Sequence, residues 1–107
     1  MDITQLRNKV VAVDFDNTIT LLSRYPVTGK IDVKAIPVIK TLQEQGNKII
    51  LWTCREGEEL EEAIMLCKAY GLTFDRINEN IDGTYTRKIK ADLYVDDKAV
   101  FPWWKEK

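Results

Sequence analysis

The stretch from Val10 to Thr18, which reads VVAVDFDNT, decides the fold. Its first half is a nearly continuous apolar run, which is typical of a strand buried on both faces of a parallel sheet. Beyond it, short apolar runs alternate with amphipathic segments, a pattern that indicates an α/β fold with a mostly parallel sheet. A length of 107 residues suits one domain, so we expect a single domain spanning residues 1–107.

Three further strands and two helices are predicted around this first strand. Pro37 is expected in the first turn of the first helix, so that the regular helix begins later than its apolar spacing suggests. Turn-forming residues predict loops at Asn17–Asp32 and Asn78–Arg87. In chain order the predicted elements are a strand at Val10–Phe15, a helix from near Asp32 closed by Gly46, a strand at Lys48–Thr53, a helix from about Glu58 closed by Gly71, and strands at Phe74–Ile77 and Asp92–Val95.

The composition narrows the chemistry. The chain has no histidine, which excludes a Cys-His dyad, a Ser-His-Asp triad and a histidine-ligated zinc site. Its 16 basic and 17 acidic residues leave a net charge of −1, which argues against a nucleic-acid partner. There is neither an apolar run of the ~20 residues that a membrane helix needs nor a signal-peptide pattern. We therefore expect a cytoplasmic protein with no membrane partner. Because histidine is absent, any catalysis would depend on carboxylates, lysine, hydroxyls or a hard metal ion.

Polar residues stand at the carboxyl ends of three predicted strands: Asp14 and Asp16, then Thr53, then Asp96 and Asp97. In open parallel sheets ligands bind at this edge, so these residues are expected to meet. Two carboxylates two residues apart suit a nucleophile and a general acid/base, although a capped turn would use the same residues. Paired acids after a strand are typical Mg²⁺ ligands, and a threonine hydroxyl with nearby amides can hold phosphoryl oxygens.

Two lysines precede the last predicted strand, in the run RKIKADLYVDD. Lys88 or Lys90 would neutralise the acidic pair and the charge of a transferring phosphoryl group. The alternative for either residue is a solvated charge run before a strand. Two other motifs are excluded, because no P-loop sequence occurs and Ile19 stands where an EF-hand loop requires glycine.

In order and spacing, D-F-D-N-T, a strand closing on Thr53, a downstream lysine and a terminal hydrophobic-D-D resemble the four motifs of the haloacid dehalogenase (HAD) superfamily. The runs ILWTCREGE and RKIKADLYVDDK look like a subgroup of very small, capless bacterial and phage HAD hydrolases. This resemblance extends from Val10 to about Trp104. It implies a minimal Rossmann-like, HAD-type three-layer sandwich without a cap domain, since no interval between the motifs has room for one.

The resemblance also implies a reaction, the hydrolysis of a phosphate monoester. Asp14 would attack phosphorus and form an aspartyl-phosphate, while Asp16 would protonate the leaving oxygen and then deprotonate the hydrolytic water. Mg²⁺ would be held by the Asp14 carboxylate, the backbone carbonyl of Asp16 and Asp96, with Asp97 assisting. The acid at position 16 favours a phosphate ester over a carbon–halogen bond as the substrate.

By the same resemblance, Thr53 and Lys88 would bind the phosphoryl oxygens, with Lys88 preferred to Lys90 as the motif lysine. Arg55 would add an anion contact beside Thr53. Capless relatives often act on large substrates, or they oligomerise so that a neighbouring subunit covers the site. In this chain the Asn17–Asp32 loop is the candidate local lid. A homo-oligomer is therefore among the expected arrangements. The terminal Trp103 and Trp104 would be buried either by such a partner or by the protein's own core.

Two other classes of function remain open. A response-regulator-like receiver also combines a phosphorylatable aspartate, Mg²⁺ ligands, a threonine and a lysine, but its acid pair comes at the first strand and its acceptor later. An inactive HAD-like binding module is the second alternative, although every expected acid is present. Neither the substrate nor the physiological pathway follows from the sequence, because specificity depends on loops and neighbours rather than on the fold.

Overall fold

The computed structural model describes residues 5–24, 26–96 and 102–105. Its strands and helices alternate along the chain much as the apolar pattern predicts, with two short extra strands inside a predicted loop. The elements are β1 (Val10–Asp14), β2 (Thr20–Leu21), β3 (Lys30–Ile31), α1 (Ala35–Glu44), β4 (Lys48–Trp52), α2 (Gly57–Ala69), β5 (Arg76–Ile77) and β6 (Leu93–Val95).

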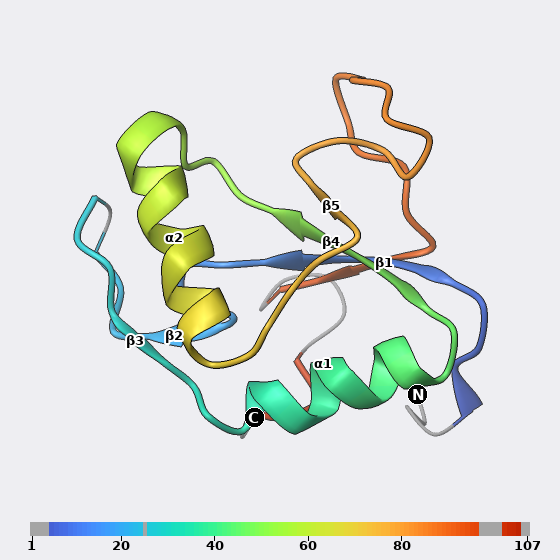
Figure 1. Ribbon diagram of the computed structural model, residues 1–107, viewed down its shortest axis with the longest axis horizontal. Coiled ribbons are helices and arrows are strands. Elements are labelled where there is room, and N and C mark those ends of the chain that lie inside the picture. The colour runs from blue at the N-terminus through green and yellow to red at the C-terminus, as the bar shows by residue number, and fades with distance from the viewer. Residues whose placement is uncertain (1–4, 25, 97–101, 106–107) are drawn as a thin grey trace.

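The main sheet has four strands in the order β5-β4-β1-β6, and every pairing in it is parallel. Strand β1 is central, with β4 on one side and β6 on the other (Figure 1). This position explains its unbroken apolar sequence, because Val11, Ala12 and Val13 are all fully buried. The predicted α/β class with a mostly parallel sheet is therefore confirmed.

The sheet is the middle of three layers. Val11 and Val13 face the core that includes Ile39 of α1 and Cys67 of α2, so both helices cover this face. On the other face Ala12 packs with residues of the irregular segment that joins β5 to β6. In Figure 1, α1 lies below the strands and the orange segment after β5 lies above them. The fold is thus minimal and Rossmann-like, with an irregular segment as its third layer.

The helix boundaries follow local hydrogen bonding. The backbone carbonyl of Asp32 accepts the Ala35 amide at 2.9 Å, and its carboxylate accepts the Lys34 amide at 3.2 Å. Helix α1 therefore begins three residues after Asp32, with Pro37 in its first turn as expected. Gly71, at φ +80°, follows α2 in a conformation that favours glycine. Within the described part of the chain, no helix combines the length and apolar character needed to cross a bilayer.

The predicted loop at Asn17–Asp32 contains a two-stranded antiparallel sheet, formed by β2 and β3. We call residues 17–32 the hairpin segment. The sequence did not predict these strands, because two residues are too few to show an alternating pattern. The Asp32 amide donates to the Ile19 carbonyl at 2.8 Å, and Asn17 exchanges two hydrogen bonds with Ser23, of 2.8 and 3.1 Å. These bonds close the hairpin segment onto the turn that follows β1.

Glycine is required at position 29, because there the backbone of the hairpin segment packs closely against the backbone at Leu21. A Cβ atom at this position would lie 1.9 Å from the Leu21 carbonyl oxygen, which is backbone and cannot rotate away. Gly29→Ala is therefore expected to lower the free energy of unfolding by about 2–3 kcal/mol, measured by thermal denaturation. Val27→Ala is the matched control on the same segment, since that side chain is 67% exposed and should matter little. Equal melting temperatures for both variants and the wild type would contradict the close approach of position 29 to the Leu21 carbonyl oxygen.

The carboxyl-terminal residues close the protein's own core. The Trp104 side chain is 6% exposed, and its Nε1 donates a 3.0 Å hydrogen bond to the Thr18 carbonyl. Trp103 packs against the same core cluster. Lys105 forms an ion pair of 3.6 Å with the buried Asp32. Trp104 is therefore buried within the chain, whereas Trp103 is only partly buried there.

Candidate functional site

The register of the sheet brings three strand ends together. Asp14, the last residue of β1, pairs with Trp52, the last residue of β4, and Asp96 directly follows β6 on the other side. A cleft of about 210 Å³ lies at this edge, lined by Asp14, Trp52, Thr53, Cys54 and Asp96. The predicted convergence of Asp14, Thr53 and Asp96 is therefore found, at the edge where a parallel sheet places its ligands. We call this space the strand-end cleft.

Asp14 has a strongly perturbed carboxyl group. Its pKa is raised from 3.8 to about 6, chiefly by burial and also by the charges of Asp16 and Asp96, while a hydrogen bond from the Phe15 backbone acts in the opposite direction. The Thr18 hydroxyl donates to Asp14 Oδ2 at 3.4 Å and lowers the pKa slightly. A desolvated carboxylate facing two like charges is a candidate nucleophile or metal ligand, because a cation or an electrophile would relieve the repulsion.

Asp16 does not line the strand-end cleft; it is held by Arg55. The guanidinium donates from Nε to Asp16 Oδ2 at 2.8 Å and from Nη2 to Oδ1 at 2.7 Å. The Arg55 side chain is fully buried, whereas that of Asp16 is 24% exposed. In this arrangement the Arg55 donors serve partners within the chain, and its contact with a phosphoryl group stays a prediction.

The other Arg55 contacts join three parts of the protein. Its Nη1 lies 3.4 Å from the Pro26 carbonyl of the hairpin segment and 3.4 Å from the Glu59 carbonyl of α2. The guanidinium carbon also lies 5.2 Å from the centre of the Phe15 ring, within cation–π range. Arg55 thus fixes Asp16, the hairpin segment and the start of α2 relative to one another.

Thr53 begins a turn that leads from β4 towards α2. Its hydroxyl accepts the Arg55 amide at 3.2 Å, and its own amide donates to Asn78 Oδ1 at 2.8 Å. Asn78 adopts φ +53°, a conformation that asparagine tolerates better than most residues. The sequence indicated Asn78 only as a turn former, and a lone asparagine carries no signal that would reveal its contact with Thr53.

The two candidate lysines lie in different places. Lys88 Nζ is 4.9 Å from the centre of the Tyr94 ring, and that ring contacts Trp52 of the strand-end cleft. Lys90 instead lines a hollow with Val10, where β1 begins. Of the two lysines, Lys88 is the one connected to the strand-end cleft, through Tyr94 and Trp52, although it does not line the cleft itself.

Mg²⁺ fits the donor set of the strand-end cleft. Asp14 and Asp96 both line it, and the charge of Asp96 contributes to the raised pKa of Asp14. Mg²⁺ in proteins takes one or two carboxylates and keeps several waters. Within residues 5–24, 26–96 and 102–105, no three Cys, Asp or Glu side chains form a metal-binding group. Asp97, a further predicted ligand, lies outside the described residues.

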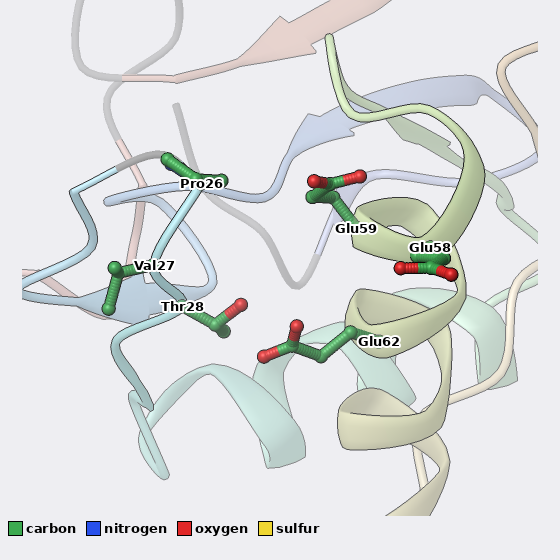
Figure 2. A pocket seen from close by; sticks show the side chains of 6 residues that line it. All are labelled: Pro26, Val27, Thr28, Glu58, Glu59 and Glu62. Carbon is green, nitrogen blue, oxygen red and sulfur yellow. The ribbon is translucent and has the colours of Figure 1, made fainter.

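A second hollow, of about 430 Å³, lies between the hairpin segment and the first turns of α2 (Figure 2). Glu59 and Glu62 extend from the helix towards the hairpin side chains, and Glu58 also lines the hollow. Their negative charge would repel a phosphate group, so this hollow is a poor candidate for the predicted substrate. Its lining residues are Pro26, Val27, Thr28, Glu58, Glu59 and Glu62.

Sequence reasoning missed Trp52 and Cys54, although both line the strand-end cleft. Trp52 immediately precedes Thr53 in a predicted strand, and parallel pairing would have placed it beside Asp14 had the register been known. Cys54 is a free, exposed thiol, while the thiol of Cys67 is buried and its pKa is raised by that burial to about 12. Cys67 belongs to the buried core and is 0% exposed.

A solved structure, described as that of a conserved protein coded by a locus of Bacteroides thetaiotaomicron, is similar to this chain with a TM-score of 0.81 and 42% sequence identity. The similarity covers 92% of this chain and 84% of that one. Comparisons with models of protein families and with curated proteins give no match. The chain therefore belongs to the same family as this conserved Bacteroides protein.

Proposed function

We propose that the protein is a Mg²⁺-dependent phosphohydrolase of the HAD type that acts on a phosphate monoester, with Asp14 as the nucleophile. The observation that supports this most is the meeting of Asp14, Asp96 and Thr53 in one cleft, although 82 residues separate the two acids. The motifs in D-F-D-N-T and V-D-D resemble those of HAD enzymes in order, and phosphoryl transfer needs mainly positioning and charge neutralisation. A cytoplasmic location is part of this proposal.

In the proposed reaction, an Asp14 oxygen attacks phosphorus and a new P–O bond forms as the ester P–O bond breaks. The leaving alkoxide takes a proton from Asp16, which later accepts a proton from the water that hydrolyses the aspartyl-phosphate. The Thr53 turn and Lys88 would hold the phosphoryl oxygens. The raised pKa of Asp14, about 6, suits a nucleophile that is ionised at neutral pH yet poorly solvated.

Asp16 has to turn away from Arg55 to take part. Both of its oxygens accept hydrogen bonds from the guanidinium. In this arrangement neither oxygen is placed to donate a proton to a leaving group in the cleft. Catalytic contacts are often incomplete before substrate binds. Because Arg55 also contacts the Pro26 carbonyl, a shift of the hairpin segment over a bound substrate would loosen this pair.

When bound, Mg²⁺ would neutralise the acids of the cleft and the charge that develops on the transferring phosphoryl group. Asp14, Asp96 and the Asp16 backbone carbonyl are the described residues proposed to hold it. The predicted role of Asp97 belongs to the same proposal.

The test is phosphate release from p-nitrophenyl phosphate, with Mg²⁺ and with a chelator, for the wild type, Asp14→Asn and Asp92→Asn. Asp92 is the matched control, because its carboxylate accepts the Val10 amide at the amino end of β1, away from the cleft. We expect Mg²⁺-dependent release from the wild type and Asp92→Asn but not from Asp14→Asn. Release that survives the loss of Asp14 would refute the proposal, while a long-lived phosphorylated adduct would favour a receiver-like role.

A further inference from the structure

Trp52 stands directly beside the proposed nucleophile. Asp14 and Trp52 are register partners on adjacent parallel strands, so their side chains project from the same face of the sheet, about 5 Å apart at the backbone. Both line the strand-end cleft, and the indole is the largest apolar side chain there. The cleft therefore has a carboxylate wall and an aromatic wall next to each other.

The indole is supported from behind. Its ring contacts the Tyr94 ring at a centroid separation of 5.5 Å and an interplanar angle of 67°. The Tyr94 hydroxyl donates to the Ile89 carbonyl, which fixes that ring in turn. The Trp52 ring also packs against the apolar cluster around Ala12. Because both rings are held by neighbours, the indole presents a fixed surface to the cleft rather than a mobile one.

A fixed aromatic surface beside a nucleophile favours a particular kind of leaving group. The leaving oxygen stands across phosphorus from the attacking Asp14 oxygen, so the alcohol would meet the outer part of the indole, whose side chain is longer than that of Asp14 and projects from the same face of the sheet. Flat rings gain offset-stacked or edge-to-face contacts with indole that saturated rings of the same size cannot make. A ring in the alcohol would also cover apolar surface on the indole that is otherwise exposed to water.

We infer that Trp52 is a specificity-determining residue that selects phosphate monoesters whose alcohol carries a flat aromatic or heteroaromatic ring. The inference rests on the proposed function, because it places the phosphoryl group at Asp14. It adds a substrate class, which the acidic residues alone do not define.

The experiment compares phenethyl phosphate with cyclohexylethyl phosphate, two primary alkyl esters whose alcohols are similarly acidic and which differ mainly in the flatness of the ring. We expect the wild type to favour phenethyl phosphate by about fivefold to tenfold in kcat/KM. Trp52→Leu is expected to abolish the preference, and Trp52→Phe to retain part of it. Trp103→Leu is the matched control, because that indole packs against the core on the helix-covered face and its loss should leave the preference unchanged.

The outcomes separate this inference from the proposed function. Asp14-dependent turnover with no ring preference, or with a preference that survives in Trp52→Leu, would overturn the role of Trp52 alone. If no ester is hydrolysed, the two corresponding phosphonates are titrated by calorimetry into the wild type and Trp52→Leu. Tighter binding of the phenethyl compound that depends on Trp52 would then support the inference, and equal affinities would refute it.

Discussion

Asp14→Asn is expected to abolish turnover and at the same time to make the protein more stable. As the proposed nucleophile, Asp14 would form the covalent bond to phosphorus, and an amide cannot replace it, so kcat should fall by about a thousandfold or more. Stability should rise because burial and the charges of Asp16 and Asp96 hold the pKa of Asp14 at about 6 instead of 3.8. Replacing a carboxylate with a purely structural role would not produce a loss of turnover together with a gain in stability.

The sign of the stability effect follows from proton linkage. A raised pKa means that the folded chain binds this proton more tightly than the unfolded chain, so the associated stability is present below about pH 4 and is lost as pH rises through about 6. Above pH 6 the wild type therefore carries an ionised, poorly solvated group. After allowance for partial solvent screening, the penalty is about 1–2 kcal/mol. Removing it should raise Tm by roughly 5–10 °C.

The measurement is thermal denaturation of the metal-free wild type and Asp14→Asn between pH 4 and pH 8. The gap in Tm should be widest above pH 7 and should narrow towards pH 4. Added Mg²⁺ should raise the Tm of the wild type, because binding to the folded state stabilises it, and should affect the variant much less. A gap that is constant with pH would show that Asp14 is not the group whose pKa is raised.

Arg55→Met is expected to lower the free energy of unfolding by about 3 kcal/mol. Loss of the guanidinium leaves the Asp16 carboxylate without its two donors and leaves the Pro26 and Glu59 carbonyls without the Arg55 contact. The expected loss is at the lower end of the range for buried pairs, because Asp16 is 24% exposed and water can reach it. Arg55→Lys should be intermediate, since an ammonium keeps the charge but lacks the two-pronged geometry.

Chemical denaturation of Arg55→Met, Arg55→Lys and Asp16→Asn, together with a control and a double variant, tests this expectation. Arg76→Met is the matched control, because Arg76 is an exposed arginine whose pairing with Glu79, at 3.4 Å, lies on the surface; the change should cost about 0.5 kcal/mol or less. The double variant Asp16→Asn/Arg55→Met should be more stable than the sum of the two single losses predicts. Strict additivity would mean that the pair contributes nothing to the folded state.

Much of the site could be predicted from the sequence, because it depends on strand ends. The apolar run that ends at Asp14 and the shorter one that precedes Asp96 identify parallel strands, and parallel strands share one functional edge. Thr53 was located for the same reason. These expectations needed only the periodicity of the chain and no knowledge of side-chain packing.

The remaining features depend on which side chains meet in three dimensions, and periodicity does not encode this. Arg55 lies in a turn, where either a solvent-facing or a buried guanidinium is compatible with the sequence; the nearby Asp16 decides the outcome. The neighbour relation of Trp52 and Asp14 depends on strand register. The hairpin within residues 17–32 was missed because it is held mainly by bonds of Asn17, Ser23 and Asp32 rather than by long strands.

The central position of β1 also has a consequence for synthesis of the protein. The pairing of β1 with β4 becomes available once residues 48–52 have left the ribosome, whereas the second acid of the cleft lies 82 residues after Asp14, at position 96. At about 5–20 residues per second, this interval lasts roughly 4–16 s. During that time the nascent chain carries the Asp14 carboxylate without Asp96, β6 or the Trp104 bond to Thr18. The cleft is therefore among the last features to be assembled, and a stalled chain would retain the helices but not the site.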